Sequence, residues 1–94
     1  NPTKGSEINK IRPAVVVSPD ELNRHLNTVI IIPLTSTLTP YPWRVKCTLD
    51  GKEGMIATDQ IRTVDKLRIG KQAGVLNEDE RESLIDVLEE MFIL

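Results

Sequence analysis

The chain has 94 residues and a net charge of −2, and this length suits one small domain. Its composition, 39% hydrophobic and 28% charged, is typical of a folded protein and argues against a disordered one. No apolar run approaches the roughly 18 residues that a membrane helix needs, and no signal-peptide pattern opens the chain, so we expect a cytoplasmic protein without membrane contact.

Cysteine and histidine each occur once, as Cys47 and His25. A single cysteine cannot form an internal disulfide, which suits a reducing compartment. A structural zinc ion takes about four cysteine or histidine ligands, so a zinc site is implausible, and we predict no metal and no cofactor. A mechanism that needs two histidines as acid and base is also excluded.

The chain opens with a predicted loop, a strand and a short helix. Residues 1–12 carry Gly, Pro and charges without apolar periodicity, which is typical of a loop, and residues 13–17 form a β-branched strand. Ser18 and Glu21, three residues apart with a proline between them, make a capping-box pattern. This pattern predicts a helix that starts after Ser18 and runs to about His25, which we expect to be exposed.

The most apolar segment, residues 28–34, predicts a central strand that ends at Pro33 and the hydroxyl cluster after it. A loop with prolines follows over residues 38–42. Residues 43–49 then alternate apolar and polar side chains, which is the pattern of a strand with one face on the core. We therefore expect Cys47 to point inward. Trp43 shares its phase and has two readings, core packing and base stacking, of which core packing is favoured.

The remaining segments predict a hairpin, further strands and a terminal helix. Asp50-Gly51 is a strong hairpin signal. Strand patterns cover residues 54–59, 60–64 and 68–75, and a helix begins at residue 77. Its apolar stripe is Leu84, Ile85, Leu88, Met91 and Phe92. Short strands without βαβ alternation predict a mainly β fold, a curled antiparallel sheet or barrel with small helices, as a single domain over residues 1–94.

Charge is distributed unevenly along the chain. Residues 77–94 contain seven acidic side chains and one basic side chain, whereas the rest contains eleven basic and seven acidic ones. A basic body is compatible with an anionic partner such as nucleic acid, although solvated surface charge explains it equally well. Within that body, the combination of Glu7, Arg12, Thr35 and Ser36 is suited to a phosphate, because a guanidinium donates two parallel hydrogen bonds and hydroxyls donate from the side. By composition alone, an ordinary surface charge is the favoured interpretation of Arg12.

Several motifs together resemble the MazF/PemK toxin family. They are the loop NPTKGSE at residues 1–7, RPAVVV at 12–17, PLTS at 33–36, YPW at 41–43 and DQIRTVDK at 59–66. The resemblance covers essentially the whole chain in the right order. In that family a further strand precedes the loop, so we expect the first strand to be missing from this chain, through truncation or disorder.

The resemblance implies an SH3-like β-barrel of the CcdB/MazF/PemK type and a homodimer. It also implies the toxin half of a type II toxin–antitoxin system. The implied activity is that of an mRNA interferase, a metal-independent and sequence-specific endoribonuclease that cleaves single-stranded RNA. The implied partners are the RNA substrate and a cognate antitoxin protein.

Residue roles follow from the same matched motifs. Arg12 and Thr35 take the positions assigned to catalysis, and Glu7 matches a loop glutamate that either acts as base or orients Arg12. The residues expected to bind the RNA phosphates are Lys4, Lys10, Arg44 and Lys46. Tyr41 is the predicted base-stacking side chain. Asp59-Gln60 matches a pair that lines the RNA groove in the family. The full predicted RNA-binding set is Lys4, Ser6, Asn9, Lys10, Ser36, Thr37, Tyr41, Arg44, Lys46, Asp59 and Gln60.

The sequence also departs from part of the family. Some members have a histidine where Ser6 stands and an arginine where Ala57 stands, so their acid–base mechanism does not carry over. The alternative function is a non-catalytic toxin on the same fold, such as a CcdB-like gyrase poison, or an RNA- or DNA-binding module. A gyrase poison would use an aromatic C-terminal end, whereas residues 91–94 (MFIL) resemble packing residues.

Overall fold

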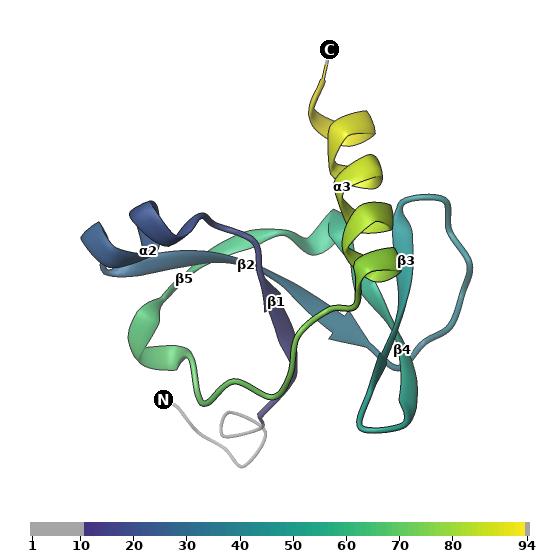
Figure 1. Cartoon of the computed structure of the whole chain (residues 1–94), viewed down its shortest axis with the longest axis horizontal. Helices are drawn as coiled ribbons and strands as arrows, with labels where there is room; N and C mark the ends of the chain where they lie inside the picture. Colours follow the sequence, from purple (N-terminus) through teal and green to yellow (C-terminus); the bar gives the residue numbers. More distant parts are fainter. Residues whose placement is uncertain (1–10, 94) are drawn as a thin grey trace.

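Strand β2, Thr28–Thr35, is the centre of the sheet in the computed structural model, which describes residues 11–93. One edge of β2 pairs antiparallel with β1, Ala14–Val16. The other edge pairs with β5, Arg62–Asp65, and further along with β4, Lys52–Ala57. β3, Arg44–Leu49, pairs with the outer edge of β4. The predicted mainly β fold is confirmed as an antiparallel half-barrel with small helices at its margins (Figure 1).

A 3-10 helix, η1 (Thr58–Gln60), bends the sheet between β4 and β5. Ile31 of β2 pairs with Arg62, whereas Leu34 pairs with Ile56. Between these two pairs, β2 has two residues (32–33) and the opposite segment has five (57–61). The extra residues of the longer segment form η1. The two strands predicted around this point are confirmed, with the break between them shifted to η1.

Pro33 lies within β2 and does not end it, and the strand predicted over residues 28–34 runs one residue further, to Thr35. The Leu34 amide donates to the Pro13 carbonyl over 3.1 Å, which shows that even-numbered amides of β2 face β1. Pro33 faces the opposite edge, next to the stretch where η1 interrupts the pairing. A proline there removes no ladder hydrogen bond, and the strand continues to Thr35.

Helix α2, Asp20–His25, forms as predicted, but Ser18 does not cap it. Ser18 is buried, and its hydroxyl donates to the Oδ1 of Asn23 and accepts from the amide of Ile30 over 3.0 Å. The serine thus ties α2 to β2, and the predicted capping box is wrong. His25 is exposed, as expected.

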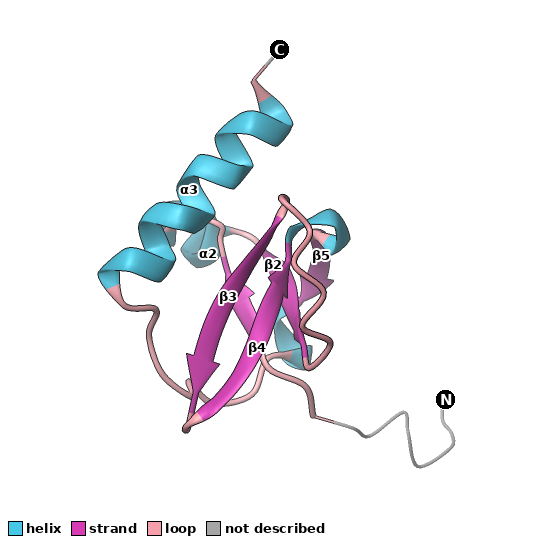
Figure 2. Cartoon of the chain, turned by 90° about the vertical axis from the view of Figure 1, so that its right-hand side faces the viewer, coloured by secondary structure: helices cyan, strands magenta, loops and turns pink. Residues whose placement is uncertain are grey.

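The core lies between the curled sheet and helix α3, Glu78–Phe92 (Figure 2). It contains Ile32, Val45, Cys47, Ile56 and Leu84, so the inward position of Cys47 is confirmed. The predicted α3 stripe is only partly buried, because Ile85 and Phe92 are 44% and 59% exposed. None of the helices in the described part is long and apolar enough to cross a bilayer.

Two connections complete the fold. Asp50 and Gly51 have φ angles of 51° and 77°, as a tight hairpin turn requires, so the predicted hairpin is confirmed. The predicted strand over residues 68–75 is wrong. A 3-10 helix, η2 (Lys66–Arg68), is followed by an extended segment without sheet partners that leads to α3.

Candidate functional site

Arg12 and Thr35 lie just beyond the ladder between β1 and β2, where the register of that ladder, extended past Pro13, makes them partners. The bond from the Leu34 amide to the Pro13 carbonyl carries the antiparallel pairing beyond β1, and the same register sets Arg12 opposite Thr35. Directly opposed residues place their side chains on one face, with Cβ atoms about 5 Å apart. Arg12 is exposed and Thr35 is half-buried.

Thr35 is held in place by its neighbours. Its hydroxyl oxygen accepts a hydrogen bond from the Thr37 amide over 3.2 Å, which leaves the hydroxyl proton free to be donated to a ligand. The backbone carbonyl of Thr35 lies 3.0 Å from the position that a Cβ on Gly54 would occupy. Any Cβ at position 54 would push the Thr35 backbone by a few tenths of an ångström, so Gly54 allows the close approach of β4.

Ser36 and Thr37 are exposed just beyond the end of β2, directly after Thr35. The other predicted residues of the first loop lie outside the described residues. They are Lys4, Ser6, Glu7, Asn9 and Lys10.

The loop before β3 carries a stacked aromatic pair. The rings of Tyr41 and Trp43 are nearly parallel, at 7°, with centroids 4.7 Å apart. Trp43 is 40% exposed, so the prediction that it packs in the core is wrong. The alternation that suggested burial fails because β3 begins at Arg44, which leaves Trp43 in the loop, where it stacks on Tyr41.

Arg44 and Asp59 form a two-point ion pair between β3 and η1. The Nε and Nη2 atoms of Arg44 donate to the two carboxylate oxygens over 3.0 and 3.1 Å. These hydrogen bonds hold the pKa of Asp59 below its ordinary value and raise that of Arg44. The guanidinium carbon also lies 5.4 Å from the Tyr41 ring centroid, a cation–π distance. The Arg44 side chain is therefore held against Asp59 and Tyr41 and does not reach freely into solvent.

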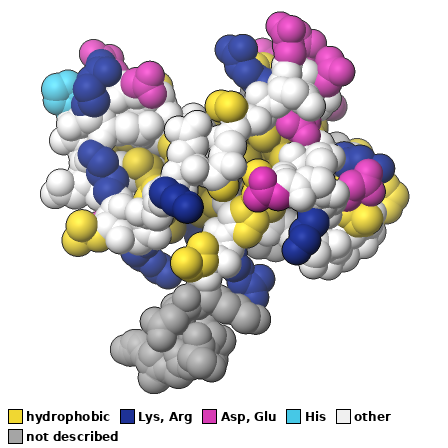
Figure 3. Space-filling view, turned by 60° about the horizontal axis from the view of Figure 1, so that its bottom comes forward, with side chains coloured by type: hydrophobic (Ala, Val, Ile, Leu, Met, Phe, Trp, Pro, Cys, Tyr) yellow, Lys and Arg dark blue, Asp and Glu magenta, His cyan; other side chains and the backbone are white. Residues whose placement is uncertain are grey.

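The other predicted groove residues on β3 and η1 are exposed. Lys46 lies 3.7 Å from Glu53 in a solvent-exposed ion pair, and Gln60 ends η1 next to Asp59. Figure 3 shows the basic side chains as separate spots over the visible face, with the acidic ones gathered mainly over α3. An anion approaching this face therefore meets several weak attractions rather than one continuous patch.

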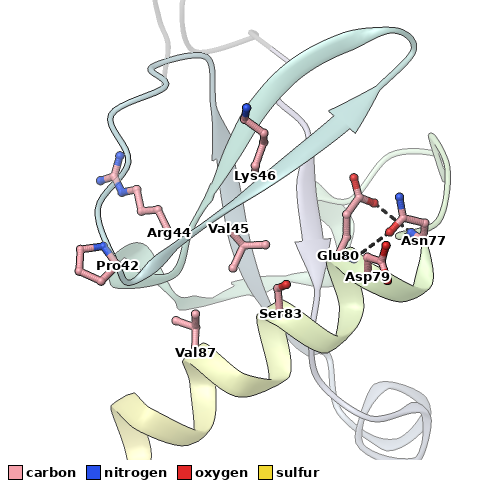
Figure 4. A pocket seen from close by; sticks show the side chains of 9 residues that line it. All are labelled: Pro42, Arg44, Val45, Lys46, Asn77, Asp79, Glu80, Ser83 and Val87. Atoms are coloured by element: carbon pink, nitrogen blue, oxygen red, sulfur yellow. Dashed lines mark hydrogen bonds between the residues drawn. The ribbon is translucent and has the colours of Figure 1, made fainter.

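A groove of about 390 Å³ runs between β3 and α3. Arg44 and Lys46 contribute to it from β3, and Glu80 and Ser83 from α3, as Figure 4 shows. Glu80 is not free, because its two oxygens accept from the amides of Asn77 and Thr48, each over 2.9 Å. These bonds lower the pKa of Glu80, while burial raises that of the neighbouring Cys47 thiol.

The sequence contains signals for two features that we did not predict from it. Tyr41 and Trp43 are two residues apart in a segment with two prolines, which is a setting for a rigid aromatic pair. Asn77 and Glu80 have capping-box spacing, and their reciprocal bonds are present in the structure.

A family model of PemK-like, MazF-like toxins of type II toxin–antitoxin systems matches residues 1–92. The chain belongs to this family. The resemblance seen in the sequence motifs is therefore confirmed. The endoribonuclease toxin MazF of Escherichia coli (strain K12) is 34% identical to this PemK/MazF-like chain over 64 residues, which cover 68% of the chain and 58% of that relative.

Solved structures show the same fold. A MazE–MazF structure from Deinococcus radiodurans has a TM-score of 0.77 at 26% identity and matches 88% of this chain and 83% of its own. The Mycobacterium tuberculosis toxin MazF-mt6 has a TM-score of 0.78 at 21% identity, with 88% and 87% covered. The half-barrel of this PemK/MazF-like chain is therefore the MazF fold.

Proposed function

We propose that this chain is the toxin of a type II toxin–antitoxin pair and cleaves single-stranded RNA without a metal ion. The observation that supports the proposal is the β1–β2 register, which, extended past Pro13, pairs the exposed Arg12 with Thr35, whose hydroxyl oxygen accepts from the Thr37 amide. The E. coli relative is named as an endoribonuclease toxin, which supports the same activity here. An enzyme that cuts mRNA in this way would act in the cytoplasm.

The reaction we propose is an internal displacement at phosphorus. The 2′-oxygen of one nucleotide attacks the adjacent phosphorus and gives up its proton to a base. The bond to the 5′-oxygen of the next nucleotide breaks, and that oxygen takes up a proton. The products are a 2′,3′-cyclic phosphate and a 5′-hydroxyl end, so no water enters the bond that is cut.

Arg12 and Thr35 would stabilise the transition state of this reaction. Negative charge grows on the non-bridging oxygens as the fifth bond to phosphorus forms, and a guanidinium can donate two hydrogen bonds to them. The Thr35 hydroxyl donates a third. Removing one such prepositioned donor typically lowers the rate by about 10²–10³-fold. Arg12 is unsuited to be the base, because a guanidinium stays protonated in proteins and has no lone pair with which to accept a proton.

Glu7 has two candidate roles, the base of this reaction or the group that orients Arg12, and orientation is slightly favoured. The other side chains of the predicted groove would bind RNA outside the reacting phosphate. Ser36 and Thr37 extend the hydroxyl row beyond Thr35, and Lys46 offers a charge to the backbone. The first loop would contribute further RNA contacts through Lys4, Ser6, Asn9 and Lys10. The loop before β3, β3 itself and η1 would contribute RNA contacts through Tyr41, Arg44, Asp59 and Gln60.

The proposed partners are a cognate antitoxin and a second copy of the chain. The Deinococcus radiodurans structure pairs MazF with MazE, which supports an antitoxin here. Ile85, Phe92 and Ile93 of the α3 region are 44–68% exposed, and apolar side chains of this size favour burial in a homodimer. Light scattering at micromolar concentration should give the mass of two chains, and the mass of one chain would contradict the dimer.

The test of the activity uses the purified chain and one long transcript in the presence of EDTA. We expect cuts at a small set of related sites, with 5′-hydroxyl ends that primer extension can map. The competing function, poisoning of gyrase, would leave the transcript intact and instead stabilise gyrase–DNA breaks. Intact RNA would therefore overturn the proposal.

A further inference from the structure

The stacked pair of Tyr41 and Trp43 is exposed to solvent, at 43% and 40% of the two residues. Trp43 covers one face of Tyr41, and the guanidinium of Arg44 lies over the same tyrosine ring. Trp43 has no aromatic neighbour besides Tyr41 among the described residues. Arg44 and Trp43 therefore both contact the Tyr41 ring, whereas the described residues place only Tyr41 against the ring of Trp43.

The pair is braced in this position by several independent contacts. The Arg44 amide donates to the Tyr41 carbonyl over 3.0 Å, and the Tyr41 amide donates to the Thr39 carbonyl over 2.9 Å. The Arg44 side chain is only 12% exposed, and its Nε and Nη2 atoms both donate to Asp59. Such a brace fixes the rings before any ligand arrives, so a ligand does not have to bear the entropy cost of ordering them.

We propose that the outer face of Trp43 is a nucleobase-stacking platform, with Tyr41 as its backing and the Arg44–Asp59 pair as its brace. This inference rests on the proposed RNA cleavage and names the residue that sets the position of one base. Bases stack on aromatic rings through their flat faces, which every base possesses, and the open indole has that shape. Tyr41, the stacking residue favoured by the sequence, serves here as the support.

The position of the platform relative to the candidate reacting phosphate fits a neighbouring nucleotide. Thr35 pairs with Met55 of β4, and Met55 pairs with Lys46 of β3. The β3 strand is therefore two strand spacings, about 10 Å, from Thr35. Trp43 precedes β3 at its start, so a base on Trp43 belongs to a nucleotide near the cut and not to the cut phosphate itself.

A nucleobase suits this surface better than an antitoxin side chain does. The surface next to the rings presents the Asp59 carboxylate already neutralised by Arg44, so it carries no free charge for an acidic peptide to pair with. The contact on offer is a flat apolar face rather than a pocket, and it suits a flat aromatic ligand. An antitoxin that uses Trp43 while RNA does not is the competing outcome of the test.

The test uses the fluorescence of Trp43, the only tryptophan in the chain. The probe is the short RNA around a mapped cut site, with a 2′-deoxy sugar at the cut nucleotide so that it binds without reacting. We expect saturable quenching of Trp43. Replacing the bases one at a time by abasic sugars should abolish the quenching at one position near the cut and leave it at the others.

A double-mutant cycle then tests whether that base contacts Trp43. Trp43→Leu should weaken binding of the intact probe by between about 5-fold and 150-fold, the usual range for loss of one stacked base. It should add little when that base is already abasic, and Trp43→Phe should recover most of the loss. Leu38→Ala is the matched control, because Leu38 is an equally exposed apolar residue of the same loop, at 46%.

The brace has its own readout in the free protein. Asp59→Asn leaves one acceptor oxygen for Arg44, so we expect faster wobbling of Trp43 in time-resolved anisotropy and a smaller quenching amplitude. Asp59→Glu, which keeps the carboxylate, should restore much of both. Unchanged anisotropy in Asp59→Asn would show that Arg44 and Asp59 are not positioning residues for the platform.

The outcomes separate this inference from the proposed function. If the chain cuts RNA but no abasic position couples to Trp43, the platform is wrong and the ribonuclease stands. If only an antitoxin peptide quenches Trp43, the platform is likewise wrong. If RNA is neither bound nor cut, the proposed function fails and the platform with it. The abasic series uses the wild-type chain, so the test does not depend on whether any variant folds.

Discussion

Glu80 of α3 accepts a hydrogen bond from the backbone amide of Thr48 in β3, over 2.9 Å. Its other oxygen accepts from the Asn77 amide at the start of the same helix. One carboxylate therefore caps α3 and satisfies an outward-facing amide of an edge strand. The bond to Thr48 also blocks that edge against pairing with another chain, which is a common hazard of exposed strands.

Glu80→Gln should destabilise the fold by about 1–2 kcal/mol. The amide side chain has one acceptor oxygen, so either Thr48 or Asn77 loses its partner, and a cap or a charge-assisted hydrogen bond has this size. Urea unfolding at a fixed protein concentration measures the change. Glu82→Gln on the same helix is the matched control, because Glu82 is exposed and no hydrogen bond of its side chain is found within residues 11–93. Equal stability of the two variants would contradict the role of Glu80.

The same carboxylate predicts a pH dependence. The two backbone hydrogen bonds lower the pKa of Glu80 in the folded state, so the unfolded chain binds the proton more readily. The contribution is fully present above the ordinary glutamate pKa of about 4.3, and it is lost as the pH falls through the lower folded-state value. The stability gap between wild type and Glu80→Gln should therefore narrow below about pH 4. A constant gap from pH 7 to pH 3 would sink this explanation.

Much of the fold follows from local pattern because local chemistry decides it. The apolar run of β2, the Asp50-Gly51 turn and the acidic start of α3 each specify one element. The errors occur where distant contacts decide. Ser18 has the sequence of a helix cap, but its hydroxyl bonds to β2, and the residues after η2 have strand propensity but no neighbouring strand to pair with.

Gly54→Ala should lower the rate of RNA cleavage by roughly tenfold while leaving the chain folded. The new Cβ would meet the Thr35 carbonyl at 3.0 Å, so the backbone that carries the candidate hydroxyl must move by a few tenths of an ångström. Displacements of this kind at a reacting site have large kinetic effects, up to about 100-fold for about 1 Å. Gly70→Ala is the control, because a Cβ there meets nothing within 4 Å. Equal rates in the two variants would show that the position of Thr35 does not limit the reaction.

An antitoxin that covers the basic part of this chain should bind in a salt-dependent way. Outside residues 77–94 the chain carries eleven basic and seven acidic side chains, so an acidic segment is the expected complement. Raising salt from about 0.1 to 1 M shortens the screening length from about 10 to 3 Å, and the Kd should rise severalfold. A Kd that is flat across this range would show that apolar contacts alone hold the complex.

The candidate site is less accessible to sequence reasoning than the fold is. Arg12 and Thr35 could be named from motifs, but their juxtaposition depends on the register of β1 on β2, which a slip of one residue would destroy. For Trp43, the sequence pattern predicts the wrong environment. Its alternation with Val45 predicts burial, and only the start of β3 at Arg44 reveals that the indole lies outside the sheet.

Thr35→Val keeps the shape of the side chain and removes the hydroxyl, so it tests whether that group acts in the transition state. We expect the single-turnover rate at saturating protein to fall by about 10- to 100-fold, less than for loss of a charged donor. The Thr37 amide also loses its acceptor, and Thr35→Ser controls for this because serine restores both hydrogen bonds. If serine fails to recover the rate, the methyl group and not the hydroxyl is what the reaction needs.

Arg12→Ala should lower the saturated cleavage rate by at least about 100-fold while RNA binding falls far less. An interaction that forms mainly in the transition state appears in the rate constant and not in the affinity. Arg12→Lys should recover only part of the rate, because an ammonium group is a point charge and cannot make the two parallel hydrogen bonds. The measurement is single-turnover cleavage of a short RNA, paired with binding of its unreactive 2′-deoxy form.

Lys46→Ala is the contrasting variant, since loss of a charge that binds the RNA backbone should weaken RNA binding and flatten its salt dependence. If Arg12→Ala loses affinity and keeps its saturated rate, Arg12 is a binding residue, and the charge that stabilises the transition state must come from elsewhere in the chain.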